Sequence, residues 1–422
     1  MPLRAHRRIL AASLIGTAVE FYDFYIYATA AALVFGPLFF PAESASAQLL
    51  AAYASFGLAF VARPLGAAVF GHFGDRAGRK STLVASLLLM GGSTVAIGLL
   101  PTYQSIGWWA PAILCALRFG QGLGLGGEWG GASLLAVENA PPGWANRFGM
   151  FPPLGAPVGF IAANGFFLLL GLTMSDATFA AWGWRIPFLA SAVLVVLGLW
   201  VRLKLTETPA FVEAARAEAL PRVPIATLFA EHLGPTLAGV FGVVACFALF
   251  YLATAFALGY GTNELGYSRQ TFLAVELLAI PFLALGVILS SVLADRHGAG
   301  AMLGAGFVGC IVVGGAMGPM LGAGSLLVIW CWLAIALFVM GFAYGPLGGW
   351  LPSLFPAGVR YTGVSVTFNA GGIIGGALAP IVAQGLVSRG GLHLVGAYLV
   401  VAGILSLIGL AMLRVRPRAA AA

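Results

Sequence analysis

Charged residues are scarce in this chain of 422 residues: Asp, Glu, Lys and Arg make up 8% of it, whereas soluble domains carry about 25%. So little charge does not cover a water-exposed surface, which excludes a cytosolic enzyme and a disordered regulator. Cysteine is scarce too. The 4 cysteines fall inside apolar runs with neither disulfide nor metal-ligand spacing, which excludes a secreted disulfide scaffold and predicts small apolar packing residues.

Several chemical signatures are also missing. The 5 His residues are scattered near the ends of apolar runs, so they form neither a metal cluster nor a nucleophile–base pair. The run GLGLGG at 122–127 has no strand before it, and GDRAGRKS lacks the GxxxxGK[ST] spacing of a nucleotide-binding loop. We therefore expect no enzyme activity, no metal and no cofactor.

Long apolar segments dominate the chain instead. Hydrophobic residues make up 60% of it and the mean hydropathy is +0.98, which predicts an all-α polytopic membrane protein. A membrane span needs about 20 apolar residues, and breaks at Pro, Gly and charge clusters leave twelve candidates. These are approximately 10–38, 48–70, 81–100, 108–136, 148–171, 184–203, 232–258, 270–294, 300–319, 325–346, 361–386 and 392–413.

The basic residues set the expected orientation. The N-terminus opens like a signal peptide, but its apolar run is too long and carries acidic residues, so we interpret it as a retained first helix. With that end inside, most of the 21 Lys and Arg fall in cytoplasmic segments, and only Arg185, Arg269 and Arg389 fall in outside loops. Both termini are therefore expected in the cytoplasm. The net charge of +7 is then a topology signal, and no nucleic-acid partner is expected.

The chain divides near its middle. The longest polar stretch, 204–222, separates six spans from six and is expected to form a short cytoplasmic helix. We expect a six-helix bundle at 1–203, a central cytoplasmic loop at 204–231, and a second bundle with a short tail at 232–422. GHFGDRAGRK at 71–80 has an echo in SVLADRHGAG at 291–300, which indicates two related halves.

The motifs of the N-terminal half carry a family resemblance. They are EFYDFYIYATAAALVFGPLFFP (20–41), FVARPLGAAVFGHFGDRAGRK (60–80), LRFGQGLGLGGEWGGA (117–132), WGWRIPF (182–188) and TETPAF (206–211), with a looser match at GWLPSLFP (349–356). The chain resembles the major facilitator superfamily and, within it, the metabolite:H+ symporter family. The resemblance implies twelve helices in two six-helix halves, a place in the bacterial inner membrane, and small organic acids or zwitterions as cargo.

Five ionisable residues fall within the expected spans: Glu20, Asp23, Arg63, Arg118 and Glu128. Each would cost roughly 2.5–3.5 kcal/mol at mid-membrane if left without compensation. Glu20 and Asp23 share a helix face because they are three residues apart, and repulsion and desolvation together favour a proton on one of them. Two guanidinium groups at depth can bind a carboxylate. An alternative is that these charges pair only with each other and fix the helix packing.

These residues give a candidate site. Proton coupling is assigned to Glu20, Asp23, Arg118 and Glu128; the resemblance implies that role for the acidic pair of the first span and for the Arg of RFxQG. Substrate binding is assigned to Arg63, Arg118, Tyr22, Tyr25, Gln121, Trp129, Asn164 and Asn369. For the two Asn an interhelical contact, and for the aromatics a packing role, are open alternatives. Glu276 is left between a place near the outer surface and one in the cavity.

A cytoplasmic gate is expected between the second and third spans. The DRxGRK loop implies, from the resemblance, a latch between the two halves, whereas the alternative is a plain basic turn. The candidate gating residues are Asp75, Arg76, Gly78, Arg79, Lys80 and Glu138, with Asp295 and Arg296 in the second copy, which has lost the basic pair.

The sequence therefore predicts a secondary active transporter that imports a small organic acid or zwitterion by proton symport, with the proton gradient as its energy source. A mono-, di- or tricarboxylate, or a shikimate-like acid, would suit the two arginines. The first alternative is a proton-driven antiporter that exports drugs or metabolites on the same fold. A receptor or scaffold without transport and a channel are further alternatives.

Overall fold

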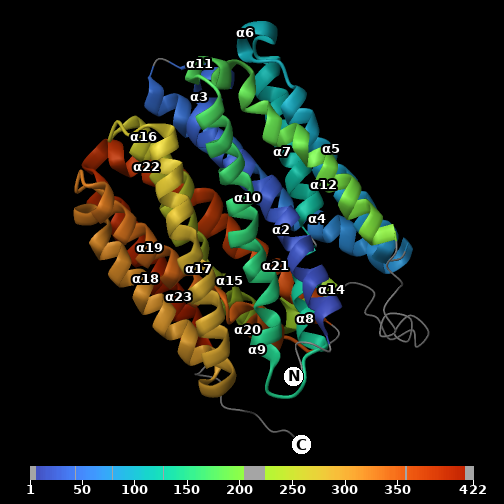
Figure 1. The fold of residues 1–422 in the computed structure, drawn as a ribbon. Coiled ribbons are helices and arrows are strands. Elements are labelled where there is room, and N and C mark those ends of the chain that lie inside the picture. Colours follow the sequence, from blue (N-terminus) through green and yellow to red (C-terminus); the bar gives the residue numbers. More distant parts are fainter. Residues whose placement is uncertain are drawn as a thin grey trace, which may run out of the picture.

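The computed structural model describes residues 6–42, 44–77, 79–126, 128–203, 224–356 and 359–413. Within these ranges the regular structure is helical throughout (Figure 1). The side chains of 71–77 and 79–83 lie outside the description, and so do 204–223, where most of the expected central loop falls.

The N-terminal half contains helices that correspond to the first six expected spans. Their bounds are α2 Arg7–Ala30, η1 Ala31–Phe35, α3 Gly36–Phe39, α4 Ala45–Ala77, α5 Arg79–Leu99, α6 Tyr103–Ile106, α7 Trp109–Leu125, α8 Glu128–Glu138, α9 Ala145–Gly149, α10 Phe151–Thr173, α11 Asp176–Thr178, η2 Phe179–Gly183 and α12 Arg185–Leu203. The segments labelled η are π-helical turns within longer helices.

The C-terminal half repeats this arrangement. Its helices are α14 Pro224–Glu231, α15 Leu233–Tyr251, η3 Leu252–Phe256, α16 Ala257–Asn263, α17 Arg269–His297, α18 Ala299–Leu321, α19 Leu326–Tyr344, α20 Leu347–Ser353, α21 Arg360–Gly372, η5 Ile373–Ala377, α22 Leu378–Gly390 and α23 Leu392–Met412. Each of the last six expected spans corresponds to one of these helices or to a continuous series of them.

Nine helices in the described ranges are long and apolar enough to cross a membrane alone, and the bent pair formed by 176–183 and 185–199 makes a tenth. The other two expected spans are shorter as apolar helices. One is α5, apolar over Val84–Leu99. The other is α7 with α8, because the expected span 108–136 breaks at Gly126. The twelve expected spans are thus all helical, and the fourth is two helices rather than one.

Helix pairing is the same in the two halves. In the N-terminal half the most extensive contacts join α2 to α10, α4 to α7 and α5 to α12. The corresponding pairs in the C-terminal half, six spans later, are α15 with α21, α17 with α19 and α18 with α23. The halves meet along α10 with α17 and along α4 with α21. This repetition is the structural form of the sequence echo between 71–80 and 291–300.

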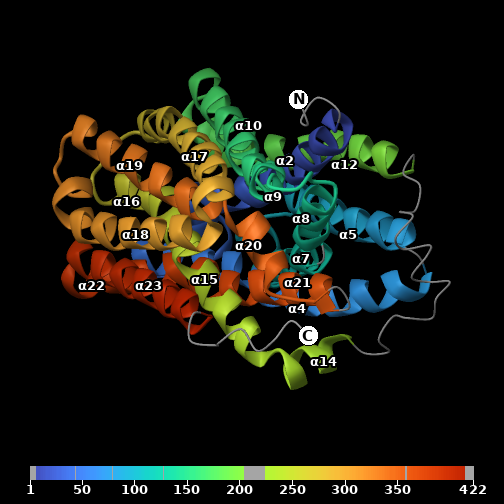
Figure 2. The same cartoon turned by 90° about the horizontal axis from the view of Figure 1, so that it is seen from below.

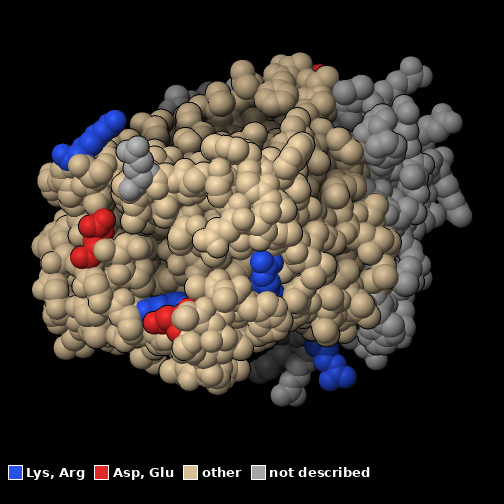
Figure 3. Space-filling model, turned by 90° about the horizontal axis from the view of Figure 1, so that it is seen from above, with Lys and Arg blue, Asp and Glu red and all other residues tan. Residues whose placement is uncertain are grey.

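The two halves lie side by side with both chain ends at one end of the bundle (Figures 1 and 2). Seen from the opposite end, the surface is mainly uncharged, with a few basic and acidic groups (Figure 3). Large apolar side chains are exposed along the helices, among them Leu172, Val193, Leu278 and Leu327. Exposed apolar surface on this scale suits contact with lipid rather than water.

Glycines allow α4 and α7 to cross closely. A Cβ at Gly122 would overlap the backbone of Ala59, and one at Gly126 would overlap the carbonyl oxygen of Arg63. On the facing helix, a Cβ at Gly66 would overlap the backbone of Leu123. Small residues at the crossing permit this close approach, which brings the buried residues of α7 next to those of α4.

Replacing one of these glycines should therefore loosen the N-terminal half. We expect Gly122→Ala to destabilise the protein by about 1–3 kcal/mol, because its methyl group can be accommodated only by moving backbone. The measurement is the melting temperature in detergent, followed by a thiol-reactive dye that reaches the buried Cys246 and Cys310 on unfolding. Gly92→Ala is the matched control, since no neighbouring helix or side chain lies within 4 Å of the position that its Cβ would take. Equal melting temperatures for the two variants would contradict this account.

Candidate functional site

Asp23 is held at the meeting point of three helices. It lies on α2 and is 1% exposed. Its Oδ1 accepts a hydrogen bond of 2.5 Å from Ser191 Oγ on α12, and its Oδ2 accepts one of 3.3 Å from Thr94 Oγ1 on α5. Hydroxyl donors from two neighbouring helices thus solvate a carboxyl group that would otherwise be costly within the membrane.

A continuous path of hydrogen bonds leads from Asp23 to Arg118. Arg118 Nη1 donates to Gln121 Oε1 at 2.9 Å, and Gln121 Nε2 donates to Thr94 Oγ1 at 2.7 Å. Thr94 then links to Asp23 as described above. We call these residues and Ser191 the polar relay. Arg118 and Gln121 are 0% and 1% exposed, so the relay crosses the interior of the N-terminal half without contact with solvent.

Aromatic rings surround the two buried arginines. The guanidinium carbon of Arg118 lies 4.0 Å from the ring centre of Tyr27 and 4.2 Å from that of Phe24. The guanidinium carbon of Arg63 lies 4.4 Å from the same Phe24 ring and 4.9 Å from Phe60. Phe24 is therefore a shared partner, and cation–π attraction offsets part of the desolvation of both cations.

Both arginines have hydrogen-bond donors that no described residue accepts. Nε of Arg63 and Nη2 of Arg118 are buried and have no hydrogen-bond partner among the described residues. Arg63, 5% exposed, acts electrostatically on Tyr25 and Tyr251, and the carboxylate of Glu20 acts on Tyr251 and on other tyrosines nearby. The expected cluster of Glu20, Arg63 and Arg118 is thus brought to one region between the halves.

Trp129 joins this region to the C-terminal half. Its ring stacks on Phe368 with centres 3.7 Å apart and planes 5° apart, and its Nε1 donates to Tyr344 Oη at 3.2 Å. Asn369, next to Phe368, donates from Nδ2 to the carbonyl oxygen of Gly126 at 2.9 Å and to a carbonyl one helical turn earlier in α21. In this conformation Asn369 therefore makes an interhelical contact at the break between α7 and α8.

The remaining candidates of the N-terminal half lie at different places. Tyr22 donates to the carbonyl oxygen of Pro187 on α12 at 2.9 Å. Tyr25 stacks on Phe250 of the other half with ring centres 5.3 Å apart. Glu128 is partly buried in the first turn of α8. Tyr25 therefore reaches the interface between the halves, whereas the hydroxyl of Tyr22 is directed to its own half.

A small pocket lies next to Tyr25. It has a volume of about 10 Å³, room for about one water-sized group, and residues of both halves line it. The lining residues are Tyr25, Ala28, Thr29, Phe160, Asn164, Thr254, Ala255, Leu258 and Glu276. Asn164 accepts a hydrogen bond of 2.5 Å at Oδ1 from Thr29 Oγ1. Glu276, which the sequence left between two places, is 1% exposed and lies in this pocket.

The halves are in contact at the end that carries the termini. Asp295 accepts hydrogen bonds from the backbone N–H groups of Asn146 and Arg147 at 2.9 and 3.3 Å, and Arg147 Nε lies 3.2 Å from its Oδ2. Asp295 thus caps the N-terminus of α9 from the other half, where a helix favours negative charge. Glycines of the two halves also touch here, since a Cβ at Gly348 would overlap the backbone of Gly149.

The other gating candidates are less informative. Arg296 is exposed in the last turn of α17, and Glu138 is exposed at the end of α8. The side chains of Asp75, Arg76, Arg79 and Lys80 lie outside the described residues, as does Gly78 altogether. The latch expected from the first loop therefore stays a prediction.

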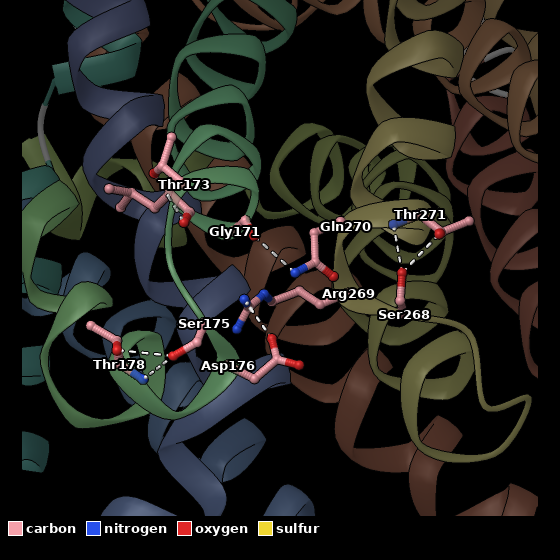
Figure 4. A network of polar contacts seen from close by, with 10 residues as sticks. Gly171, Thr173, Ser175, Asp176, Thr178, Ser268, Arg269, Gln270 and Thr271 are labelled. Carbon is pink, nitrogen blue, oxygen red and sulfur yellow. Dashed lines mark hydrogen bonds and ion pairs between the residues drawn. The ribbon is translucent and has the colours of Figure 1, made fainter.

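The halves are also in contact at the opposite end (Figure 4). Arg269 Nη2 lies 2.9 Å from Asp176 Oδ1, and Gln270 Nε2 donates to the carbonyl oxygen of Gly171 at 3.0 Å. Closer to the pocket, Tyr53 Oη on α4 donates to the carbonyl oxygen of Ala255 in η3 at 2.7 Å. Because cross-contacts occur at both ends, the enclosed conformation is occluded.

The hydroxyl residues of the relay, Thr94 and Ser191, were not predicted from the sequence. Neither is charged, so neither disturbs the apolar pattern of its span. Also not predicted were Asn146 and Arg147 as partners of Asp295, and Arg185, which donates to the carbonyl oxygens of Gly98 and Leu100 and so caps α5. The Arg within WGWRIPF was the available signal for that cap.

Comparisons with known proteins agree with the fold. Residues 9–220 match the family described as sugar (and other) transporter. The chain is 48% identical to the inner membrane metabolite transport protein YhjE of Escherichia coli (strain K12), over 97% of this chain and 94% of that protein. It is 36% identical to the shikimate transporter of the same strain, over 96% and 94%, and 30% identical to its proline/betaine transporter, over 95% and 82%.

Solved structures have the same fold. The proton:xylose symporter XylE bound to 6-bromo-6-deoxy-D-glucose superposes with a TM-score of 0.73 at 17% identity, over 97% of this chain and 95% of that one. The relatives also confirm the resemblance to metabolite:H+ symporters, and they are transporters rather than enzymes. The chain therefore belongs to the sugar (and other) transporter family and has the twelve-helix fold of the major facilitator superfamily.

Proposed function

We propose that this transporter imports a small organic acid or zwitterion by proton symport across a bacterial inner membrane. The end that carries the termini would face the cytoplasm, which the distribution of Lys and Arg along the sequence supports. The proton gradient would supply the energy, without a cofactor. The names of the relatives, a shikimate transporter and a proline/betaine transporter among them, support cargo of this size and chemistry.

The observation that carries the proposal is the polar relay between Asp23 and Arg118. Thr94 has a single hydroxyl proton and accepts a hydrogen bond from Gln121, so it can donate either to Asp23 at 3.3 Å or to the carbonyl oxygen of Met90 at 3.0 Å. An ionised Asp23 attracts this proton, whereas a protonated Asp23 leaves it to Met90. Protonation at Asp23 thereby changes the hydrogen bonding that orients the side chain of Arg118.

Arg118 would carry that change to the substrate. Its Nη2 and the Nε of Arg63 are buried donors without a described partner, and a carboxylate is the group that guanidinium donors bind best. Gln121 orients Arg118. The side chains that would line the substrate's path between the halves are Tyr25, Trp129, Asn164 and Asn369, and Tyr22 would hold α2 against α12 beside it. Glu20 and Glu128 are further candidates for the coupled proton. These roles follow from position and chemistry.

Alternating access would proceed through the two closed ends. The occluded conformation opens towards the cytoplasm when the contacts of Asp295 and Gly348 separate, and towards the other side when those of Arg269 and Gln270 separate. Substrate bound between the halves favours the conformations in which it has most contacts. The loop with Asp75, Arg76, Gly78, Arg79 and Lys80 would add to the cytoplasmic latch, with Glu138 and Arg296 near it.

The first test removes the charge of Asp23. A gradient of one pH unit supports about tenfold accumulation with one coupled proton, since a pH unit is worth about 1.36 kcal/mol. We expect Asp23→Asn in proteoliposomes to exchange labelled substrate between equal concentrations but to show no accumulation driven by pH. Glu231→Gln, an exposed carboxylate of α14, is the control and should accumulate substrate like the wild type.

The direction of proton movement separates import from export. With a pH-sensitive dye inside the vesicles, symport acidifies the lumen when an acid or zwitterion is added outside. Protons that leave the lumen when a lipophilic drug is added, with no response to any acid or zwitterion, would replace the proposal by drug/proton antiport. Normal pH-driven accumulation by Asp23→Asn would remove Asp23 from the coupling role.

The second test interrupts the relay without touching a charge. Thr94→Val keeps the shape of the side chain but removes the hydroxyl group that joins Gln121 to Asp23. We expect pH-driven accumulation to fall by about 2- to 10-fold, the equivalent of one net hydrogen bond, while exchange at equal concentrations persists. Thr94→Ser restores the hydroxyl and should restore accumulation. If Thr94→Val accumulated substrate as well as Thr94→Ser, the relay would be only structural.

The third test acts on the contact between glycines at the end with the termini. A methyl group at Gly348 meets the backbone of Gly149, so Gly348→Ala disfavours closure at this end by about 1–3 kcal/mol, a shift of about 5- to 150-fold in the balance of states. Spin labels at exposed positions 142 and 297, in a background without the native cysteines, should move apart. Gly165→Ala, where the Cβ position is open, should leave the distance distribution unchanged. Identical distributions for the two variants would contradict the prediction.

A further inference from the structure

The pocket beside Tyr25 carries a carboxyl group that the relay does not use. Glu276 comes from α17 in the C-terminal half, while Thr29 and Asn164 come from α2 and α10 in the other half. In this conformation about 10 Å³ of the pocket can be occupied by a water-sized group, roughly the space of one water molecule. It therefore suits a single polar group of a solute, such as an ammonium group, rather than the whole solute.

Glu276 is buried without compensation. It is 1% exposed, and its Oε1 has no hydrogen-bond partner among the described residues. The described residues that line the pocket include no Lys, Arg or His. A carboxylate in such a place lowers the stability of the protein unless a cation pairs with it or it takes up a proton. Because the residues that enclose it supply no cation, a ligand is the natural source of one.

The hydroxyl groups around the pocket already donate their protons to other groups of the protein. Thr29 donates to Asn164 Oδ1, Thr254 donates to the carbonyl oxygen of Phe250 at 2.7 Å, and Tyr53, which Glu276 influences electrostatically, donates to Ala255. Their oxygens keep lone pairs, and Glu276 adds a carboxylate. The pocket is therefore rich in hydrogen-bond acceptors, which suits a group with several N–H donors.

Tyr25 lines the pocket, and Arg63 packs on the ring of its neighbour Phe24. Arg63 and Arg118 do not line the pocket themselves. The π-helical segment η3 contributes Thr254 and Ala255 to the pocket, and irregular turns of this kind are frequent at functional sites.

We propose that Glu276, with Thr29, Asn164 and Thr254, binds the positively charged nitrogen of a small zwitterionic substrate. The inference rests on the proposed function and narrows its substrate class. The pair formed by ligand and Glu276 would bridge the halves from α2 and α10 to α17, so that the bound zwitterion itself stabilises the occluded conformation.

Two measurements test the proposal. The first is thermal stabilisation of purified protein in detergent by a panel of zwitterions (L-proline, L-serine, pipecolate and glycine betaine) and of nitrogen-free acids (shikimate, succinate and citrate). We expect a zwitterion to stabilise the wild type, and Glu276→Gln to weaken its binding by at least about tenfold, as for loss of a charged partner. The second is pH-driven uptake of the same compounds into proteoliposomes.

Matched variants keep the result interpretable. Glu264→Gln removes an exposed carboxylate of the same half and should bind the zwitterion like the wild type. The melting temperature of Glu276→Gln without ligand checks its folding. If Glu276→Gln does not fold, Thr254→Val takes its place: it removes one hydrogen-bond acceptor and should weaken zwitterion binding by at least about twofold.

The outcomes separate the two proposals. Binding and uptake of nitrogen-free acids alone, or equal zwitterion affinity in Glu276→Gln and Glu264→Gln, would overturn the role of Glu276 and leave proton symport standing. Stabilisation by a zwitterion that Glu276→Gln abolishes, without any proton movement during uptake, would support the pocket and reject the symport mechanism.

Discussion

The structure depends on the compensation of ionisable groups within a medium that does not hydrate them. Asp23, Arg118 and Arg63 are each 5% exposed or less, and a charge in such a place must find polar or aromatic partners within the protein. Asp23 finds two hydroxyl groups, Arg118 an amide and two rings at close range. Because these partners belong to different helices, solvating the charges also fixes how α2, α5, α7 and α12 are placed around them.

Because the charges are compensated through hydrogen bonds and aromatic rings, the site can still respond to a ligand or a proton. A direct ion pair between Arg118 and Asp23 would satisfy both groups and hold them together, whereas the relay connects them through Gln121 and Thr94 and leaves Nη2 of Arg118 free. A ligand carboxylate can therefore bind the arginine without first breaking an ion pair. In the proposed symport, the same chain of hydrogen bonds would transmit the protonation state of Asp23 to Arg118.

Sequence predicted the fold and the buried charges but not their partners. Charged residues in apolar runs are a strong signal, so Glu20, Asp23, Arg63 and Arg118 were identifiable, and the spans followed from hydropathy. Thr94 gave no signal, because a threonine in a helix can bond to its own preceding turn, as Thr94 does with Met90. It has this role only because α5 packs close to α2, and inspection of a single sequence does not reveal which helices are neighbours. The place of Glu276 was open for the same reason.

The two ends of the bundle are closed by contacts of different strength. Asp295 is 3% exposed and receives two backbone N–H groups as well as the guanidinium of Arg147, so its separation would strand a buried carboxylate. Asp176, at the other end, is 82% exposed, and an exposed ion pair contributes about 0–1 kcal/mol. Of these two ion pairs, the one opposite the termini therefore separates at lower cost. If the termini are cytoplasmic, that difference favours an empty carrier open to the outside, where substrate and protons enter.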